Sequence, residues 1–330
     1  MAVLRGSIST TFISGRAFFA ATLAAAALPA WAAYPDQPVR LLVGYPPGGA
    51  TDVVARLLAT HLSSRWGQAV VVENKPGASG MLAAEQVVRA KPDGHTLLLG
   101  YTPEVSINKL VFKQMRYDPI ADLAPLALAA TAPLVLVAGP KLPVRTLPEL
   151  LARKGADAKL SYGSPGSGGQ QHIAGELLAR LGGLPLLHVP YKGTAPALND
   201  LLGGQIDLFF ATTPPLLQHI RAGKLRPLAV AGDRREALLP DVPTFAELGM
   251  GAMQLSNWFG VFAPNGLSPA IANRVTNDLA DALKDPKVVK SLEDQGLTPS
   301  PLLGAAFKAF IEVDMRKYKA IIDQSGIVAE

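Results

Sequence analysis

The sequence predicts an α/β protein of two lobes. Short apolar runs of the kind that form buried parallel strands alternate with amphipathic helical patterns along most of the 330 residues. Glycine-rich loops follow several of these runs, at the points where the chain turns from a strand into a helix. About 300 residues remain once segment 1–33 is set aside, which is enough for two lobes rather than one.

The first strand–helix unit begins at Val39–Val43, a short apolar run of the kind that a buried parallel strand shows. It ends in a loop at 45–49, and Asp52 opens a helical pattern that carries Val53, Leu57, Leu58 and Leu62. The alternation continues with strands at 70–73 and 96–99, a helix at 82–90, and turns at 74–77 and 92–94. This order predicts helices packed on a parallel sheet.

A second unit begins near Pro133. We expect strands at 134–138, 160–162, 187–189, 206–210 and 228–231, and helices at 147–154, 173–181 and 195–202. The chain is expected to return to the first lobe near Val242. Ser268 then has the character of a helix N-cap followed by Pro269. A last helix presents an apolar side made of Phe307, Phe310, Ile311, Tyr318 and Ile322.

The N-terminal segment has the three parts of a secretory signal peptide. Arg5 and Arg16 occur without any acidic residue, an apolar run follows at 17–28, and Ala30-Trp31-Ala32 forms an A-x-A cleavage pattern. The run is shorter than the roughly 20 apolar residues of a membrane span, and Pro29 interrupts it. We therefore expect cleavage near Ala32 or Ala33 and release into the periplasm.

Composition excludes several classes of function. Loss of Arg5 and Arg16 with the signal lowers the formal net charge from +5 to +3, and no basic run marks a nucleic-acid surface. The absence of cysteine excludes disulfides and a lipoprotein anchor, and the five histidines lack the spacing of a metal site. No nucleophile elbow, Walker loop or complete dinucleotide fingerprint occurs. The sequence therefore predicts no catalytic residue, metal or cofactor.

Two glycine-rich loops, at 46–50 and 164–169, lead directly into predicted helices. Ligands of open α/β sheets bind at this edge, and a helix N-terminus can hold an anion without a charged side chain. The glycines could equally serve only tight turns. We expect the N–H groups of residues 166–168 and the Ser164 hydroxyl to converge on a carboxylate. His172 could contact a ligand or lie on a helix surface, Asp52 is expected to be a first-turn helix charge, and Glu104 is expected to face solvent.

The mature chain resembles the solute receptors of tripartite tricarboxylate transporters, the Bug family, over essentially its whole length. The resemblance lies in ordered stretches rather than in one loop. They are Val39–Val43 with Pro46-Pro47-Gly48-Gly49 and Asp52, Val71–Ala78, Pro92–Leu98, Tyr117-Asp118-Pro119, Ser164-Pro165-Gly166 with His172, His188–Gly193, Asp200–Gln205 and Leu239–Thr244.

The resemblance implies a type II periplasmic-binding-protein fold, in which two α/β lobes linked by two chain crossings close on a ligand. It places lobe 1 at 34–130 and 243–330 and lobe 2 at 131–242. It implies a monomeric receptor that passes a small mono- or dicarboxylate, amino acid or aromatic acid to the membrane subunits of a transporter. The contacts that it implies are Pro47, Gly48, Gly49, Thr51, Thr102, Ser106, Asn108, Ser164, Gly166, Ser167, Gly168, His172, Tyr191, Lys192, Thr212 and Thr213.

Departures from the family pattern bear on specificity. Gly44-Tyr45 stands where the family usually has Pro-Phe, which predicts an added hydroxyl at the cleft floor. Thr102-Pro103-Glu104-Val105 is unusual in its Pro and Glu. Ala211-Thr212-Thr213 lacks an acidic residue often found there, which favours plain carboxylates over amino acids. A sensor that presents the bound form to a signalling partner needs the same cleft, so the sequence leaves that alternative open; an enzyme is less favoured.

Overall fold

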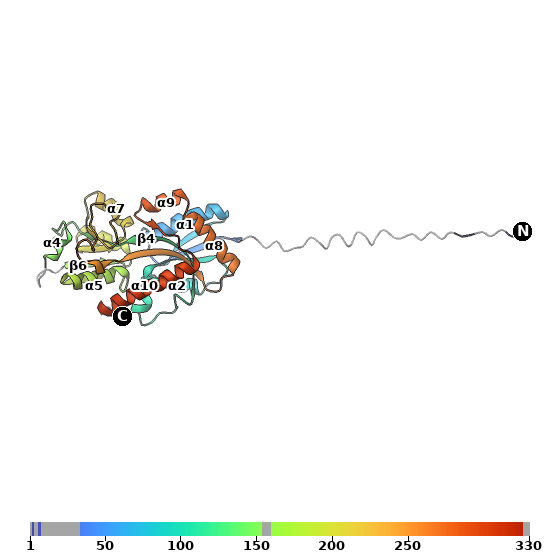
Figure 1. Cartoon of the computed structure of the whole chain (residues 1–330), viewed down its shortest axis with the longest axis horizontal. Coiled ribbons are helices and arrows are strands. Elements are labelled where there is room, and N and C mark those ends of the chain that lie inside the picture. The colour runs from blue at the N-terminus through green and yellow to red at the C-terminus, as the bar shows by residue number, and fades with distance from the viewer. Residues whose placement is uncertain (1, 3–5, 8–33, 154–159, 326–330) are drawn as a thin grey trace.

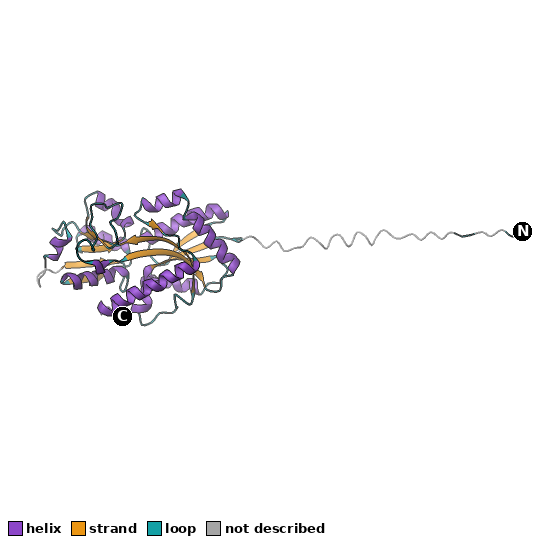
Figure 2. Cartoon of the chain, viewed as in Figure 1, coloured by secondary structure: helices purple, strands orange, loops and turns teal. Residues whose placement is uncertain are grey.

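The computed structural model describes residues 34–153 and 160–325, together with residues 2, 6 and 7. The predicted signal peptide lies almost entirely outside these residues. Two sheets lie end to end along the long axis of the molecule, each with its own helices (Figure 1, Figure 2). Among the helices that the structure describes, none is both long and apolar enough to cross a bilayer.

The first lobe is built on a six-stranded sheet in the order β11-β4-β10-β3-β1-β2. β1 pairs in parallel with β2 and β3, whereas β10 pairs antiparallel with β3 and β4. Its strands are β1 (Val39–Val43), β2 (Val70–Asn74), β3 (Thr96–Tyr101), β4 (Leu123–Pro133), β10 (Ser256–Pro264) and β11 (Thr298–Pro299).

Helices cover both faces of this sheet, which explains why β1 and β3 are apolar without alternation. Leu41 and Leu97 pack on one face and Leu42 and Leu98 on the other, in two separate cores. The helices are α1 (Ala50–Trp66), α2 (Met81–Val88), α3 (Asn108–Val111), α8 (Pro269–Ala282), α9 (Pro286–Glu293) and α10 (Gly304–Ser325). The Ser268 hydroxyl accepts the Ile271 N–H, which confirms the predicted cap.

The second lobe has a five-stranded sheet in the order β7-β6-β8-β5-β9. Its strands are β5 (Val135–Ala138), β6 (Leu160–Ser164), β7 (Leu186–Pro190), β8 (Leu208–Ala211) and β9 (Arg226–Val230). Its helices are α4 (Leu147–Leu151), α5 (Gln170–Gly182), α6 (Thr194–Gly203) and α7 (Thr213–Arg221). The predicted strands and helices of this lobe are present, but α4 ends at Leu151, before the predicted limit at 154.

Two long strands carry the chain between the lobes. β4 runs through Pro133 almost directly into β5, and β10 returns beside it with Ser256 opposite Pro133. Residues 245–255 still contact the second lobe, since Phe245, Met253 and Leu255 belong to its core. The division of the chain at residues 131 and 243 stays a prediction.

Helix α10 also joins the lobes. Phe307 and Ile311 pack in a first-lobe core, while Tyr318 and Ile322 belong to the second-lobe core. Between them, Asp314 accepts a hydrogen bond of 2.7 Å from the buried indole N–H of Trp258 on β10. The apolar side predicted for this helix is therefore shared between both lobes.

Candidate functional site

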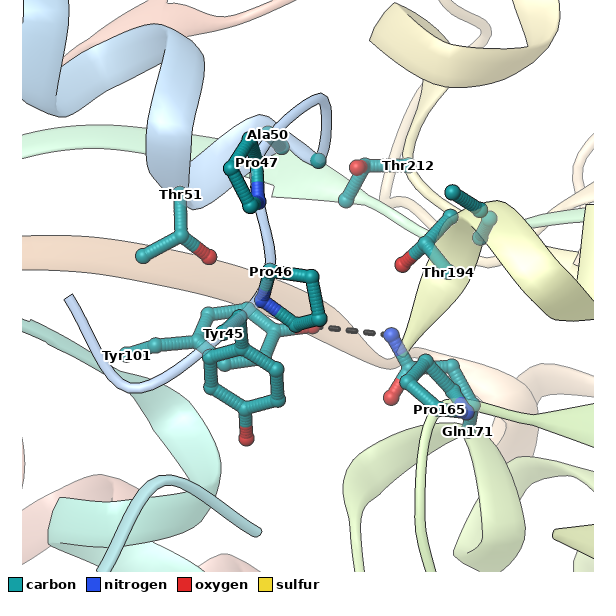
Figure 3. A pocket seen from close by; sticks show the side chains of 13 residues that line it. Tyr45, Pro46, Pro47, Ala50, Thr51, Tyr101, Pro165, Gln171, Thr194 and Thr212 are labelled. Atoms are coloured by element: carbon teal, nitrogen blue, oxygen red, sulfur yellow. Dashed lines mark hydrogen bonds between the residues drawn. The ribbon is translucent and has the colours of Figure 1, made fainter. Parts of the chain in front are cut away.

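A small cavity of about 20 Å³ lies between the lobes, and we call it the inner cavity. It holds about one water-sized group. Figure 3 shows the hydroxyls of Thr51 and Thr194 directed toward the space between the two lobes. The residues that line it are Tyr45, Pro46, Pro47, Gly49, Ala50, Thr51, Tyr101, Pro165, Gln171, Thr194, Ala195, Ala211 and Thr212.

Four helices begin at the inner cavity. Ala50 and Thr51 open α1, Thr194 and Ala195 open α6, Gln171 lies in the first turn of α5, and Thr212 is the N-cap of α7. The first N–H groups of a helix lack intrahelical partners and carry the positive end of its dipole. Since none of the described residues that line the cavity is charged, its positive potential comes from backbone.

Asp52 lies in the first turn of α1 but outside the inner cavity. Its carboxylate accepts hydrogen bonds from the Gly48 N–H at 3.2 Å, Arg56 at 2.9 Å and Asn74 at 3.1 Å. Burial disfavours its charge, but these bonds outweigh burial and hold the pKa of Asp52 below its ordinary value. Asp52 therefore braces the 46–49 loop, and the prediction of a helix charge rather than a ligand contact agrees with these bonds.

One hydrogen bond crosses the cavity floor. The Gln171 amide of the second lobe donates to the Tyr101 hydroxyl of the first at 2.8 Å, as the dashed line in Figure 3 shows. The Tyr101 ring stacks on Phe259 of β10 and meets Tyr45 edge to face, with centroids 5.3 and 5.2 Å apart. The floor is therefore a rigid aromatic surface bonded to both lobes.

Glu104 does not face solvent, and this expectation was wrong. Pro103–Ile107 forms a π-helical turn that carries the Glu104 side chain beneath the cleft floor, where it is 0% exposed. Its Oε1 accepts the Tyr101 N–H at 2.9 Å. Burial raises the pKa of this carboxyl well above its ordinary value, while the Tyr101 N–H and the Tyr45 hydroxyl partly oppose the shift. The folded protein therefore favours the protonated, neutral form of Glu104.

Tyr45 presents its ring rather than its hydroxyl to the inner cavity. Figure 3 shows the hydroxyl directed away from Thr51 and Thr212. The Tyr45 ring and the Glu104 carboxyl both lie against Gly80, so this end of the ring is on the side of the buried acid. The hydroxyl predicted at the cleft floor is therefore turned toward the buried acid instead of a ligand.

A larger space of about 490 Å³ adjoins the inner cavity, and we call it the outer chamber. Tyr45, Pro46 and Pro165 line both spaces. The Ser79 hydroxyl donates to the Ser167 carbonyl at 2.8 Å and so connects the two walls. The lining consists of Gly44, Tyr45, Pro46, Pro76, Gly77, Ala78, Ser79, Gly80, Phe112, Pro165, Gly166, Ser167, Tyr191, Lys192 and Gly193.

The structure brings half of the predicted contact residues to these two spaces. Pro47, Gly49, Thr51 and Thr212 line the inner cavity. Gly166, Ser167, Tyr191 and Lys192 line the outer chamber. Their role as ligand contacts stays a prediction.

Five other predicted residues line neither space. The Thr102 hydroxyl accepts the Trp258 N–H at 2.9 Å, the Asn108 amide donates to the Ser79 carbonyl at 2.9 Å, and the Thr213 hydroxyl donates to the buried Glu236. Ser106 is fully buried, and the Gly48 N–H is bonded to Asp52. The Thr102, Asn108 and Thr213 side chains therefore support the walls through hydrogen bonds within the protein, whereas the buried Ser106 hydroxyl has no hydrogen-bond partner among the described residues.

Loop 164–169 differs from the expected anion nest. The Ser164 hydroxyl is buried, donates to the Gly166 carbonyl at 2.9 Å and lies 2.6 Å from His188 Nε2. The Gly168 N–H donates to His172 Nδ1 at 3.0 Å. The His172 ring stacks on the His188 ring, with centroids 3.9 Å apart. These groups bond to one another, so they do not converge on an open anion site.

Sequence reasoning did not select Tyr101, Gln171 and Thr194 of the inner cavity, or Ser79 and Phe112 of the outer chamber. Thr194 carried a signal, because it opens a helix directly after the glycine of Pro190-Tyr191-Lys192-Gly193. Gln171 follows a glycine-rich loop at the same kind of position. Tyr101 and Phe112 carried none, since an aromatic residue near the end of an apolar segment is most often part of a core.

Across residues 34–153 and 160–325, no group of three or more His, Asp or Glu side chains is placed to hold a metal ion. Ser164 and His188 form a serine–histidine contact, but the serine is 0% exposed and no substrate reaches it.

Comparison with known proteins agrees with this architecture. The model of the tripartite tricarboxylate transporter family receptor matches residues 54–327. Protein BugT of Bordetella pertussis is 35% identical over 310 residues, which are 93% of this chain and 95% of that protein. Structurally, the periplasmic binding protein BugD is similar with a TM-score of 0.85 and 33% identity, over 90% of this chain and 100% of that one.

A second solved structure is that of Rpa4515 of R. palustris with adipate. It is 32% identical, with a TM-score of 0.86, and the match covers 89% of this chain and 99% of that one. The expected two-lobed α/β receptor fold is confirmed by these likenesses. The chain belongs to the family of tripartite tricarboxylate transporter receptors, the Bug proteins.

Proposed function

We propose that this protein is a periplasmic receptor that captures a small carboxylate between its lobes and delivers it to the membrane subunits of a tripartite tricarboxylate transporter. The observation that carries the proposal is the convergence of four helix N-termini on the inner cavity. Together with the Thr51 and Thr194 hydroxyls, they surround a space in which a carboxylate oxygen finds donors from both lobes.

An anion suits this cavity better than a cation or a sugar. Helix N-termini supply N–H donors and positive potential but no acceptor for an ammonium group. No acidic side chain is among the described residues that line the inner cavity or the outer chamber. This supports plain carboxylates over amino acids, and bridging water can complete the coordination of an uncharged site.

Because donors come from both lobes, the ligand stabilises the closed arrangement. Release then requires the lobes to separate, which suits a carrier that exchanges its ligand with a membrane partner. We further propose that residues 1–33 direct export and are removed, and that the receptor acts as a monomer without catalysing a reaction. Sequencing of the N-terminus of periplasmic protein tests the first point, with Ala33 or Tyr34 as the expected start.

Thermal unfolding with a ligand panel tests the main proposal. Protein freed of bound ligand by unfolding and refolding is heated with acetate, benzoate, adipate, malate, glucose and ATP. A ligand at about 100 times its Kd adds roughly 2.7 kcal/mol, which raises Tm by several degrees. We expect at least one carboxylate, and neither glucose nor ATP, to give this shift. A clear sugar shift with silent carboxylates contradicts the proposal.

The Thr51→Val variant tests the inner cavity itself. It keeps the shape of the side chain but removes a hydroxyl, and a hydrogen bond to a charged group contributes about 1.5–3 kcal/mol. We expect carboxylate affinity to fall about tenfold or more. Thr60→Val is the matched control, because Thr60 lies on the same helix with its hydroxyl bonded to the Arg56 carbonyl. Equal affinities of the two variants would exclude Thr51 from the site.

A further inference from the structure

We propose that the outer chamber holds the carbon body of the ligand and that this body is a planar aromatic ring, so that the ligand is a small aromatic carboxylate. The inference rests on the proposed function, because the carboxylate must lie in the inner cavity. Tyr45, Pro46 and Pro165 line both spaces, so a group anchored in the inner cavity extends past these residues into the chamber.

The two spaces differ in size, and each accepts a different part of the ligand. The inner cavity of about 20 Å³ accepts a carboxylate oxygen but no ring. The outer chamber of about 490 Å³ is within the range of small-molecule sites. A bound acid therefore places its charged end inward and its remaining atoms in the outer chamber.

The chamber surface is made largely of rings. Tyr45, Phe112 and Tyr191 contribute aromatic faces, and Pro46, Pro76 and Pro165 contribute proline rings. The Tyr191 hydroxyl donates to Asp200 at 2.7 Å, so it is bonded to a residue outside the chamber lining. Aromatic faces pack favourably on a further aromatic ring. An apolar body is therefore preferred over one that carries hydroxyl or ammonium groups.

The walls come from opposite lobes and are held close at two points. Gly193 lies directly against Pro46, since a Cβ added to this glycine would be only 2.8 Å from the proline ring. On another side, Ser79 is bonded to Ser167, and Asn108 holds the Ser79 carbonyl. Walls set in this way favour a rigid, flat body, because a flexible alkyl chain loses rotamer freedom when it is confined.

Lys192 is the one charged residue among the described residues that line the chamber, and its side chain is exposed at the rim. A linear dicarboxylate would use this cation for its distal charge, whereas an aromatic monocarboxylate does not need it. Removal of the Lys192 charge therefore distinguishes a linear dicarboxylate from an aromatic monocarboxylate in a binding experiment.

Calorimetric titration with benzoate, heptanoate, acetate and adipate tests the inference. We expect benzoate to bind about 100-fold more tightly than acetate, because the ring buries apolar surface, and about tenfold more tightly than heptanoate. Phe112→Leu keeps an apolar side chain but removes a ring, so benzoate should weaken about three- to tenfold while acetate is unchanged. Thr51→Val should weaken acetate and benzoate alike, Lys192→Met should weaken adipate more than benzoate, and the exposed Lys224→Ala is the control.

Four results would overturn the inference. Tight adipate binding with silent benzoate, or a tenfold loss of benzoate affinity in Lys192→Met, assigns the chamber to a distal charge and leaves the carboxylate receptor intact. Equal weakening of acetate and benzoate binding by Phe112→Leu would show that the Phe112 ring supports the fold rather than contacting the ring of the ligand. Silence of all four acids contradicts the proposed function as well.

Discussion

Replacement of Glu104 by Gln should change how stability depends on pH. Glu104 is 0% exposed, and among the described residues no basic side chain pairs with it. Burial raises its pKa in the folded protein well above the ordinary value, so the fold keeps a proton that the unfolded chain releases above about pH 4.3. The wild-type stability is therefore complete below that pH and falls by about 1.4 kcal/mol per pH unit above it while Glu104 stays protonated.

The Gln side chain has the same shape, keeps an acceptor for the Tyr101 N–H and does not titrate. The free energy of unfolding of Glu104→Gln should therefore rise relative to that of the wild type as the pH is raised through the range in which Glu104 stays protonated. Urea unfolding followed by circular dichroism at pH 5, 6, 7 and 8 measures this difference. The exposed Glu312→Gln variant on α10 is the control. Curves for Glu104→Gln and wild type that run parallel in pH would show that the buried-acid reasoning is wrong.

Three further changes probe the walls and the closure of the cleft. Burial, together with repulsion from His172, lowers the pKa of His188 to about 4. The fold therefore favours the neutral ring, and stability is lost as pH falls from about 6.5 toward 4. The His188→Phe variant should lose much less stability between pH 7 and pH 4.5, as measured by urea unfolding. Ser79→Ala removes the bond to Ser167 and should weaken carboxylate binding about two- to tenfold in calorimetry, with little change in Tm; unchanged affinity would exclude this bond from closure. Gly193→Ala places a Cβ 2.8 Å from Pro46 at a φ of 129° and should reduce affinity about tenfold or more. A Cβ added at Gly203, the last residue of α6, would meet no atom within 4 Å, so Gly203→Ala should bind carboxylate normally. Similar losses of affinity in both glycine variants would refute the steric argument.

Local sequence was sufficient for many elements of the fold. Val39–Val43 forms the predicted strand residue for residue, because its four apolar side chains lie on both faces of the sheet, where helices cover them. Ser268 and Pro269 begin α8 as their side chains predict. By contrast, β4 and β10 were not predicted. β4 is rich in Ala and Pro, which have low strand propensity, and its pairing with a strand more than 120 residues away outweighs that preference.

The site could be predicted only in part. The 46–49 loop was found because a glycine-rich turn before a helix is visible in the sequence. Loop 164–169 shows the same pattern, yet its N–H groups are bonded to His172 and Ser164 of its own lobe. Gly166 does not adopt a positive φ, whereas Gly168 does, at 74°. Hydrogen bonds between nearby residues of a folded loop decide which donors remain for a ligand, and a pattern of glycines does not specify them.

The sequence by itself determined the α/β class, most strands and helices, and the family. It could do so because apolar periodicity, caps and ordered motifs are local features of the chain. Only the tertiary structure decided that Thr51, Gln171, Thr194 and Thr212 meet at one cavity, and that Glu104 lies beneath its floor. Two chain crossings bring four helix N-termini together from distant parts of the chain. The inner cavity, where we propose that a carboxylate binds, is therefore a property of packing between the lobes rather than of any single segment.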